Sequence, residues 1–356
     1  MEKSMAEPMY PVYYDSRKAF GKHFNAHSRQ MGLKATTPAS LKAWMKRARA
    51  KLVDLLGLER LQPAAPRPRK TESVDCGDYT RERWLIETQR DVTMPFYVLA
   101  PKGAKGPLPA VLCPHGHGGG GKAAVAGVQA SEEVTAAIEN YNYAYGVAFA
   151  RAGFRVFCPD ARGFGERQEK EVRQAPLSSS CHQLQLMAGP LGIPVAGLWV
   201  FDLMRLADYV LSRKDVCPDR LGCAGLSGGG LQTLFFSAVD TRVTCAVVSG
   251  YFYGVRDSLL MMPGNCDCNV IPRLWENFDM GDVGALIAPR PLLIETGDQD
   301  GLNGAGGLKN VSSQLRIARR GYRLLGSGSH LKHDVFAGQH RWNGAEAIPW
   351  MQRWLA

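Results

Sequence analysis

Strand-like and helix-like segments alternate along most of this chain, and the alternation restricts its fold more than any other feature. Strands are predicted at 83–88, 93–100, 110–113, 155–158, 221–224, 243–248, 291–295 and 331–336, and helices at 143–152, 198–212, 231–239, 308–325 and 345–355. The first two strands form an antiparallel pair across a turn at 89–91. Beyond them, an intervening helix returns the chain so that successive strands run parallel. The sequence therefore predicts an α/β fold with a mostly parallel central sheet flanked by helices.

Two regions fall outside the alternating pattern or interrupt it. Residues 1–70 are predicted to form a helical extension, with an amphipathic helix at 38–58 and a Pro-rich linker at 62–69, whereas residues 71–356 form the α/β domain. Within that domain, the stretches 166–194 and 251–282 break the alternation. Insertions of this size on a parallel sheet tend to form lids or pocket walls.

The positive charge of the chain is concentrated at its beginning. The formal net charge is +10, and residues 1–70 hold 15 Lys/Arg and 5 Asp/Glu, so the rest of the chain is neutral overall. A nucleic-acid-binding module would show a basic face interleaved with aromatic residues, or a known fold signature. Neither is present, so we expect no nucleic-acid partner. The basic segment is interpreted as a solvated surface or as a contact in a homo-oligomer.

Cysteine usage and the first residues indicate a cytoplasmic protein. The nine cysteines are odd in number, and several lie in apolar strand-like runs, which is typical of buried free thiols in a reducing compartment. The first residues contain no apolar leader, and no apolar run reaches the roughly 20 residues that span a bilayer. Cys266 and Cys268 have no second Cys/His pair nearby in the sequence, so no metal site is expected.

The segment Gly225-Leu226-Ser227-Gly228-Gly229 matches the G-x-S-x-G pattern. In a chain with 39 glycines the match alone is weak, but here it follows a predicted strand and opens a helix. In that context small residues allow a sharp turn that exposes the serine and frees N–H groups at the helix start. Ser227 is therefore the predicted nucleophile. The alternative is a Gly-rich connection without chemistry.

A second glycine-rich loop, beginning at His115, follows the strand at 110–113. Such a loop can bring a backbone N–H to a developing oxyanion. The predicted donors are the N–H groups of Gly228 and His117. The rival phosphate-binding pattern fails because Ala123 stands where Ser or Thr is required. His115 is interpreted as a structural hydrogen-bonding residue rather than a base.

The general base and its acid partner are expected after the nucleophile in the chain. Near the end of the strand at 291–295 the carboxylates are Glu295, Asp298 and Asp300, and the residues alone leave this choice open. The histidines that follow are His330, His333 and His340. His330 precedes the last predicted strand, and His333 lies within it. His340 lies just beyond its carboxyl end, where sites of open α/β sheets gather, so it is the predicted base.

The body of the chain resembles α/β-hydrolases of the dienelactone-hydrolase and acetyl-xylan-esterase-like group. The resemblance lies in PHGHGG (114–119), DARGFG (160–165), APRPLLIE (288–295) and FAGQHRW (336–342), together with the serine motif. It implies an α/β-hydrolase fold with 71–356 as the catalytic domain. It also implies Asp300 as the acid and His340 as the base, without a metal or organic cofactor.

The predicted function is that of a serine esterase cleaving short-acyl, acetyl-like esters, with a small-molecule ester as its partner. Carbohydrate esters are candidate substrates. Trp199, Tyr251 and Trp275 lie in or near the insertions and are candidates for substrate binding. Two alternatives remain open: a serine peptidase or amidase of the same fold, and a hydrolase-fold protein that binds a ligand without turnover. The first would normally carry a larger N-terminal domain, and the second usually lacks a triad residue.

Overall fold

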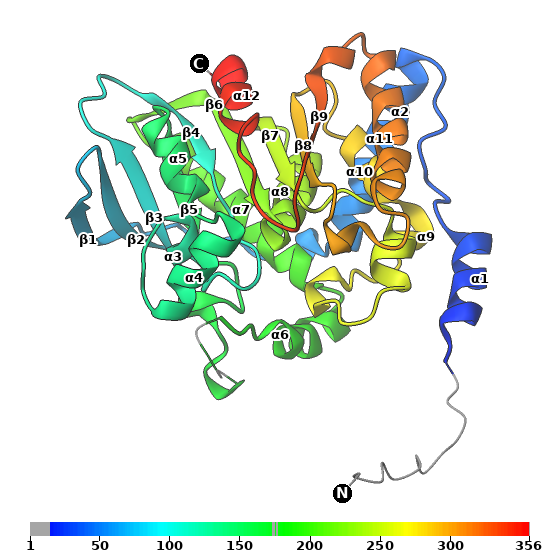
Figure 1. The fold of residues 1–356 in the computed structure, drawn as a ribbon, viewed down its shortest axis with the longest axis horizontal. Coiled ribbons are helices and arrows are strands. Elements are labelled where there is room, and N and C mark those ends of the chain that lie inside the picture. Colours follow the sequence, from blue (N-terminus) through cyan, green and yellow to red (C-terminus); the bar gives the residue numbers. More distant parts are fainter. Residues whose placement is uncertain (1–14, 173–174, 176, 356) are drawn as a thin grey trace, which may run out of the picture.

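The fold is built on one mixed sheet of nine strands, as the computed structural model of residues 15–172, 175 and 177–355 shows (Figure 1). Its strand order is β1-β2-β3-β5-β4-β6-β7-β8-β9. β2 is antiparallel to both β1 and β3, β3 is antiparallel to β5, and the neighbouring pairs from β5 to β9 are parallel. The strands are β1 (Arg69–Asp75), β2 (Tyr79–Gln89), β3 (Val92–Pro101), β4 (Leu108–Leu112), β5 (Arg155–Pro159), β6 (Val216–Leu226), β7 (Val243–Ser249), β8 (Leu292–Gly297) and β9 (Leu331–Phe336). The predicted α/β fold with a mostly parallel sheet is confirmed.

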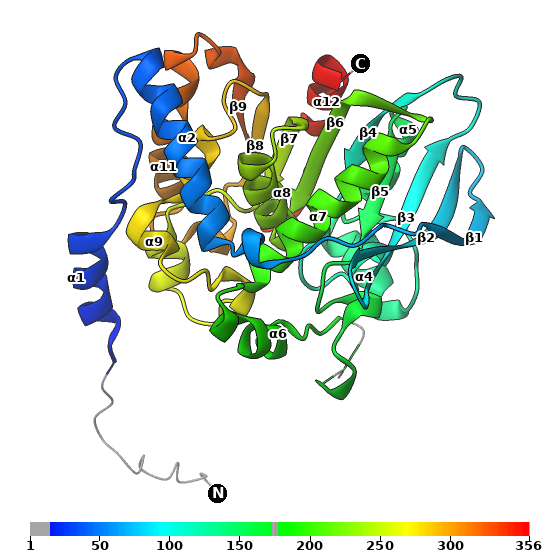
Figure 2. The same cartoon turned by 180° about the vertical axis from the view of Figure 1, so that it is seen from behind.

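Helices cover both faces of this sheet. On the face seen in Figure 1 lie α3 (Lys122–Val125), α4 (Glu132–Tyr141), α5 (Tyr145–Arg151) and α12 (Ala347–Leu355). On the face seen in Figure 2 lie α2 (Pro38–Leu55) and α7 (Val195–Ser212). The other helices are α1 (Arg17–His27), α6 (Cys181–Ala188), α8 (Gly228–Val239), α9 (Leu274–Asn277), α10 (Met280–Ala285) and α11 (Leu308–Leu324).

The core consists of two clusters, one on each face of the sheet, because alternate residues of a strand point to opposite faces. Along β7, Cys245 and Val247 belong to the cluster that includes α5 and α12, whereas Ala246 and Val248 belong to the cluster under α2 and α7. Successive side chains of a strand point to opposite faces, so a strand that is apolar at every position must be covered twice. The continuous apolar runs in the sequence follow from this double burial.

The predicted N-terminal helix exists and ends slightly earlier than expected, at Leu55. Thr37 and Ser40 form a capping box at its start, with Pro38 in the first turn. Its apolar stripe is buried in the main core cluster, so α2 is packed against the body. The division of the chain at residue 70 stays a prediction.

Three elements differ from the expected pattern for identifiable reasons. β1 forms at the sheet edge from a polar run, Arg69–Asp75, whose side chains are mostly exposed, so it carries no apolar signal. The helix expected at 231–239 begins at Gly228, because backbone geometry rather than apolar period sets its start. The stretch 251–282 contains only short helices, and one of them is a five-residue π-helix, Arg256–Leu260.

No single helix of the described chain is long and apolar enough to cross a membrane. One pair of consecutive helical segments, Cys181–Leu191 and Val195–Ser212, reaches that length and apolarity when taken together. The two segments are bent by 91° at the break between them.

Candidate active site

Ser227 lies in a strained turn between β6 and α8. Its backbone has φ 59° and ψ −119°, which is rare for a residue with a side chain. The Ser227 N–H donates to the carbonyl of Ser249 at 2.9 Å, fixing the turn against the end of β7. The Ser227 side chain makes no capping hydrogen bond to α8, so its hydroxyl is not committed to holding the helix.

The glycines on either side of Ser227 are required by close backbone contacts. A Cβ at Gly225 would lie 2.5 Å from the carbonyl carbon of Gly229, and a Cβ at Gly229 would collide with the carbonyl oxygen of Pro114. No side chain fits at either position. The serine motif is therefore a packing requirement of the turn, which aims Ser227 at the carboxyl edge of the sheet.

Asp300 and His340 meet at that same edge, although 40 residues separate them. Asp300 follows β8 and His340 follows β9, and the Asp300 Oδ2–His340 Nδ1 distance is 2.7 Å. The other oxygen of Asp300 accepts the N–H of Leu302 at 2.8 Å, which orients the carboxylate. A Cβ at Gly250 would lie 2.8 Å from the His340 ring, so a glycine there lets the imidazole approach the end of β7.

The other two carboxylates near the end of β8 do not contact His340. Asp298 is exposed and accepts the N–H of Gly338 at 2.9 Å. Glu295 is fully buried and accepts the N–H groups of Asn343 (3.2 Å) and Gly344 (2.7 Å). Both therefore stabilise the loop that carries His340: Asp298 binds the backbone before His340, and Glu295 binds the backbone after it.

Burial raises the pKa of Glu295 to about 7, although the two backbone N–H groups oppose that shift. An unfolded glutamate titrates near pH 4.3, so the folded protein holds an extra proton between about pH 4.3 and about pH 7. The contribution of this proton to the free energy of unfolding is therefore fully present below about pH 4.3. It is lost as the pH rises to about 7.

Glu295→Gln is accordingly expected to reduce the loss of stability between about pH 4 and about pH 8, because glutamine cannot ionise. Urea unfolding at a series of pH values measures this. Equal slopes for wild type and variant would show that Glu295 does not titrate in the window.

The remaining predicted histidines have structural partners. Nδ1 of His330 donates to the carbonyl of Pro289 at 2.6 Å, and Nε2 of His333 lies 3.1 Å from the hydroxyl of Thr296. His115 is buried, and its Nε2 accepts the N–H of Ala161 at 3.0 Å. Burial lowers the pKa of His115.

One cavity of about 700 Å³ opens onto Ser227, Asp300 and His340. Many of its other lining side chains carry hydroxyl or amide groups: Tyr141, Tyr143, Tyr251, Tyr253, Asn265, Asn269 and Gln339. A large part of the wall comes from the stretch 251–282, whereas no described residue of 166–194 lines the cavity. Tyr141 and Tyr143 were not predicted, because nothing in their local sequence sets them apart from core tyrosines.

The glycine-rich loop after β4 lies beside the serine turn. A Cβ at Gly116 would lie 2.9 Å from Cβ of Ser227, and the carbonyl of His117 accepts the hydroxyl of Tyr143 at 2.6 Å. Within the described residues, the N–H groups of His117 and Gly228 donate to no other group. Their roles as oxyanion donors stay predictions.

Of the three aromatic residues predicted to bind substrate, only Tyr251 lines the cavity. Trp199 is buried on α7, where its indole N–H donates to the carbonyl of Arg162 at 2.9 Å. Trp275 packs against Phe24 in a separate, mostly apolar hollow near α1. Both tryptophans lie outside the cavity lining because packing uses their faces: Trp199 packs against Phe164 and His117, and Trp275 packs against Phe24 of α1.

The strand order, the serine turn after β6 and the loops after β8 and β9 define the α/β-hydrolase fold. The chain belongs to the Abhydrolase family, whose sequence profile matches residues 27–332. YtaP of Bacillus subtilis (strain 168), named as a hydrolase, is 30% identical over 289 residues, which is 77% of this chain and 88% of YtaP.

Two solved structures share the fold at low sequence identity. One, from Bacteroides fragilis and described as an acetyl xylan esterase, has a TM-score of 0.80 at 17% identity and covers 97% of each chain. Acetyl xylan esterase 1 from Thermoanaerobacterium sp. has a TM-score of 0.59 at 16% identity, covering 94% of this chain and 98% of its own. The chain is therefore a hydrolase-family protein with esterase-like structural neighbours.

Proposed function

We propose that the protein is a serine esterase that cleaves short-acyl esters through an acyl-enzyme. One observation carries the proposal: Ser227 in its strained turn and the hydrogen-bonded Asp300–His340 pair line the same cavity. A nucleophile, a base and an acid that orients the base are the groups that this chemistry requires.

In the proposed mechanism, Nε2 of His340 takes the proton of Ser227 as its hydroxyl oxygen attacks the ester carbonyl. Asp300 fixes the tautomer of His340 by accepting its Nδ1–H and stabilises the imidazolium. The N–H groups of His117 and Gly228 bind the oxyanion. His340 then protonates the departing alcohol, and water, activated by the same histidine, releases the acid. These steps use only protein groups and water, so the proposal includes no cofactor.

The polar lining favours an ester whose alcohol carries hydroxyl groups, such as a carbohydrate. Tyr143, Tyr251 and the two asparagines already bond within the protein, whereas the side chains of Tyr141, Tyr253 and Gln339 have no partner among the described residues and can bond such a substrate. The likeness to acetyl xylan esterase structures supports the same proposal.

Labelling with a fluorophosphonate probe tests the proposed nucleophile. We expect stoichiometric modification located at Ser227 by peptide mass spectrometry, because the probe reacts with serines that an adjacent base activates. A protein that binds ligand without turnover would remain unlabelled, and that result would contradict the proposal.

Ester chain length should influence the rate strongly. With a constant 4-nitrophenol leaving group, kcat/KM is expected to be highest for acetyl to butyryl esters and to fall for octanoyl esters. Each methylene that is buried against apolar atoms adds only about 0.8 kcal/mol of binding free energy, and a methylene that lies against polar side chains adds none. A steady rise through decanoyl esters would reveal a deep apolar channel and contradict the short-acyl assignment.

A further inference from the structure

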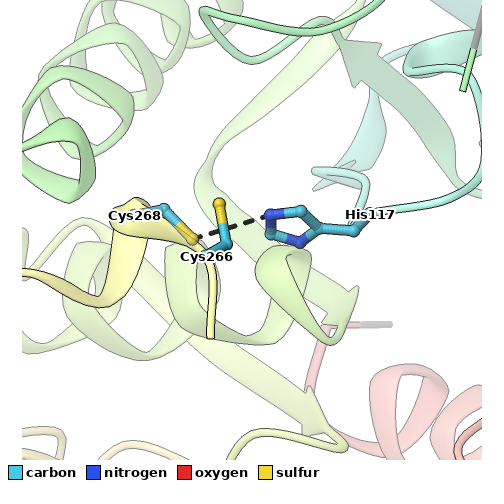
Figure 3. A group of neighbouring side chains, drawn as sticks. All are labelled: His117, Cys266 and Cys268. Atoms are coloured by element: carbon cyan, nitrogen blue, oxygen red, sulfur yellow. Dashed lines mark hydrogen bonds between the residues drawn. The ribbon is translucent and has the colours of Figure 1, made fainter. Parts of the chain in front are cut away.

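A histidine and two cysteines form a compact cluster at the wall of the cavity (Figure 3). Nε2 of His117 and the Sγ atoms of Cys266 and Cys268 all lie within 4.8 Å of one another. His117 comes from the loop after β4, and the cysteines come from the stretch 251–282. The cluster therefore unites segments about 150 residues apart in the chain.

The spacing within the cluster suits a bound metal ion. The distance from Nε2 of His117 to Sγ of Cys268 is 3.7 Å. Tetrahedral zinc, with Zn–S bonds of about 2.3 Å and Zn–N bonds of about 2.0 Å, places such ligand atoms roughly 3.6 Å apart. The three side chains thus need little movement to bind an ion between them.

A third cysteine, on a neighbouring helix, is the candidate for the remaining ligand. Cys181 is the first residue of α6 and is buried. Contacts between α6 and the short helix Asp267–Asn269 hold these segments together. Together with the cluster, Cys181 would complete a closed set of three sulfur atoms and one imidazole nitrogen, which is typical of structural zinc sites.

We propose that Cys181, Cys266, Cys268 and Nε2 of His117 bind one zinc ion. The inference does not depend on the esterase proposal, since it concerns side chains that take no part in acyl transfer. It differs from the expectation drawn from the sequence, where Cys266 and Cys268 had no neighbouring pair. The two missing ligands are distant in the chain and come together only in the fold.

Zinc at this position would fix one wall of the cavity. It would join the loop after β4, the start of α6 and the stretch 251–282, three segments that regular hydrogen-bond ladders do not link. The His117 ring also lies against Gly228, since a Cβ there would be 3.0 Å from its Nδ1. A bound ion would therefore hold His117 in place beside the serine turn, acting as a positioning element.

Metal analysis of the purified full-length chain tests the proposal directly. Protein made with zinc in the medium and kept reduced is expected to contain one equivalent of zinc per chain. Cys266→Ser and Cys268→Ser should each lose most of it, because one ligand fewer weakens a structural site strongly. The matched control is Cys217→Ser, a cysteine outside the cluster whose thiol donates to the carbonyl of Pro107 and whose zinc content should equal that of wild type.

Cobalt substitution of the wild-type protein tests for thiolate ligands without relying on a variant. Wild-type protein loaded with Co²⁺ should show intense thiolate-to-cobalt charge-transfer absorption and the visible bands of a tetrahedral ion. Zinc-free protein with free thiols would overturn the proposal, as would a disulfide among these cysteines, seen as the loss of two hydrogens in intact mass. Ser227→Ala should bind zinc like wild type, so failure of the metal site and failure of the esterase proposal are distinguishable.

Discussion

Ser227→Ala is expected to abolish ester hydrolysis and to leave the fold unchanged. In the proposed mechanism the hydroxyl forms the covalent bond, and no other serine of the described residues lines the cavity. Loss of the nucleophile in triad enzymes lowers kcat by about 10⁴-fold or more. The fold should survive because the Ser227 side chain makes no capping hydrogen bond, and the turn is held by backbone contacts that alanine retains.

The measurement is hydrolysis of 4-nitrophenyl acetate by purified protein, with circular dichroism and thermal unfolding as checks on folding. Ser212→Ala is the matched control: Ser212 ends α7, and its hydroxyl donates only to the carbonyl of Tyr209. That control should keep wild-type kcat. Retained hydrolysis by the Ser227 variant would remove the central claim, because another residue would then be the nucleophile.

Asp300→Asn is expected to be the second most damaging substitution. An asparagine amide can present its N–H₂ group to Nδ1 of His340, which favours the tautomer with the proton on Nε2, where it cannot accept the serine proton. In a serine protease with a Ser-His-Asp triad, replacing the aspartate by asparagine lowers kcat by about 10⁴-fold. We expect a loss of similar order here, with little change in KM.

Asp298→Asn provides the matched control two residues away. Asp298 is exposed, and the oxygen that accepts the N–H of Gly338 is retained in asparagine. Its kcat should remain within a few-fold of wild type. If the Asp298 variant were inactive and the Asp300 variant active, the carboxylate assignment would be wrong by two residues, although the roles of Ser227 and His340 would stand.

Most of the fold could be predicted because its physical causes are local in the sequence. Strands of a parallel sheet are buried on both faces and appear as short apolar runs, and the helices between them show their own period. The order of these runs then leaves few possible topologies. β1 was missed because an exposed edge strand needs no apolar residues, and α4 because only a few of its side chains are buried.

The candidate nucleophile and base could be located because their positions depend on strand ends. Ser227 follows β6 within a turn that only glycines permit, and His340 follows the last strand. The acid was different: Glu295, Asp298 and Asp300 lie within six residues, and their residue types do not distinguish them. Only the folded loop shows that Asp300 reaches His340 while the other two brace the backbone around it.

The cavity wall and the cysteine–histidine cluster were decided by tertiary structure alone. Tyr251 lines the cavity while Trp199 and Trp275 do not, because the packing of α7 and α1, rather than residue type, determines which aromatic face is free. His117, Cys181 and the Cys266/Cys268 pair belong to three segments with no sequence signal in common. Sequence patterns record which residues an element buries, whereas a site built from several loops depends on how the sheet brings their ends together.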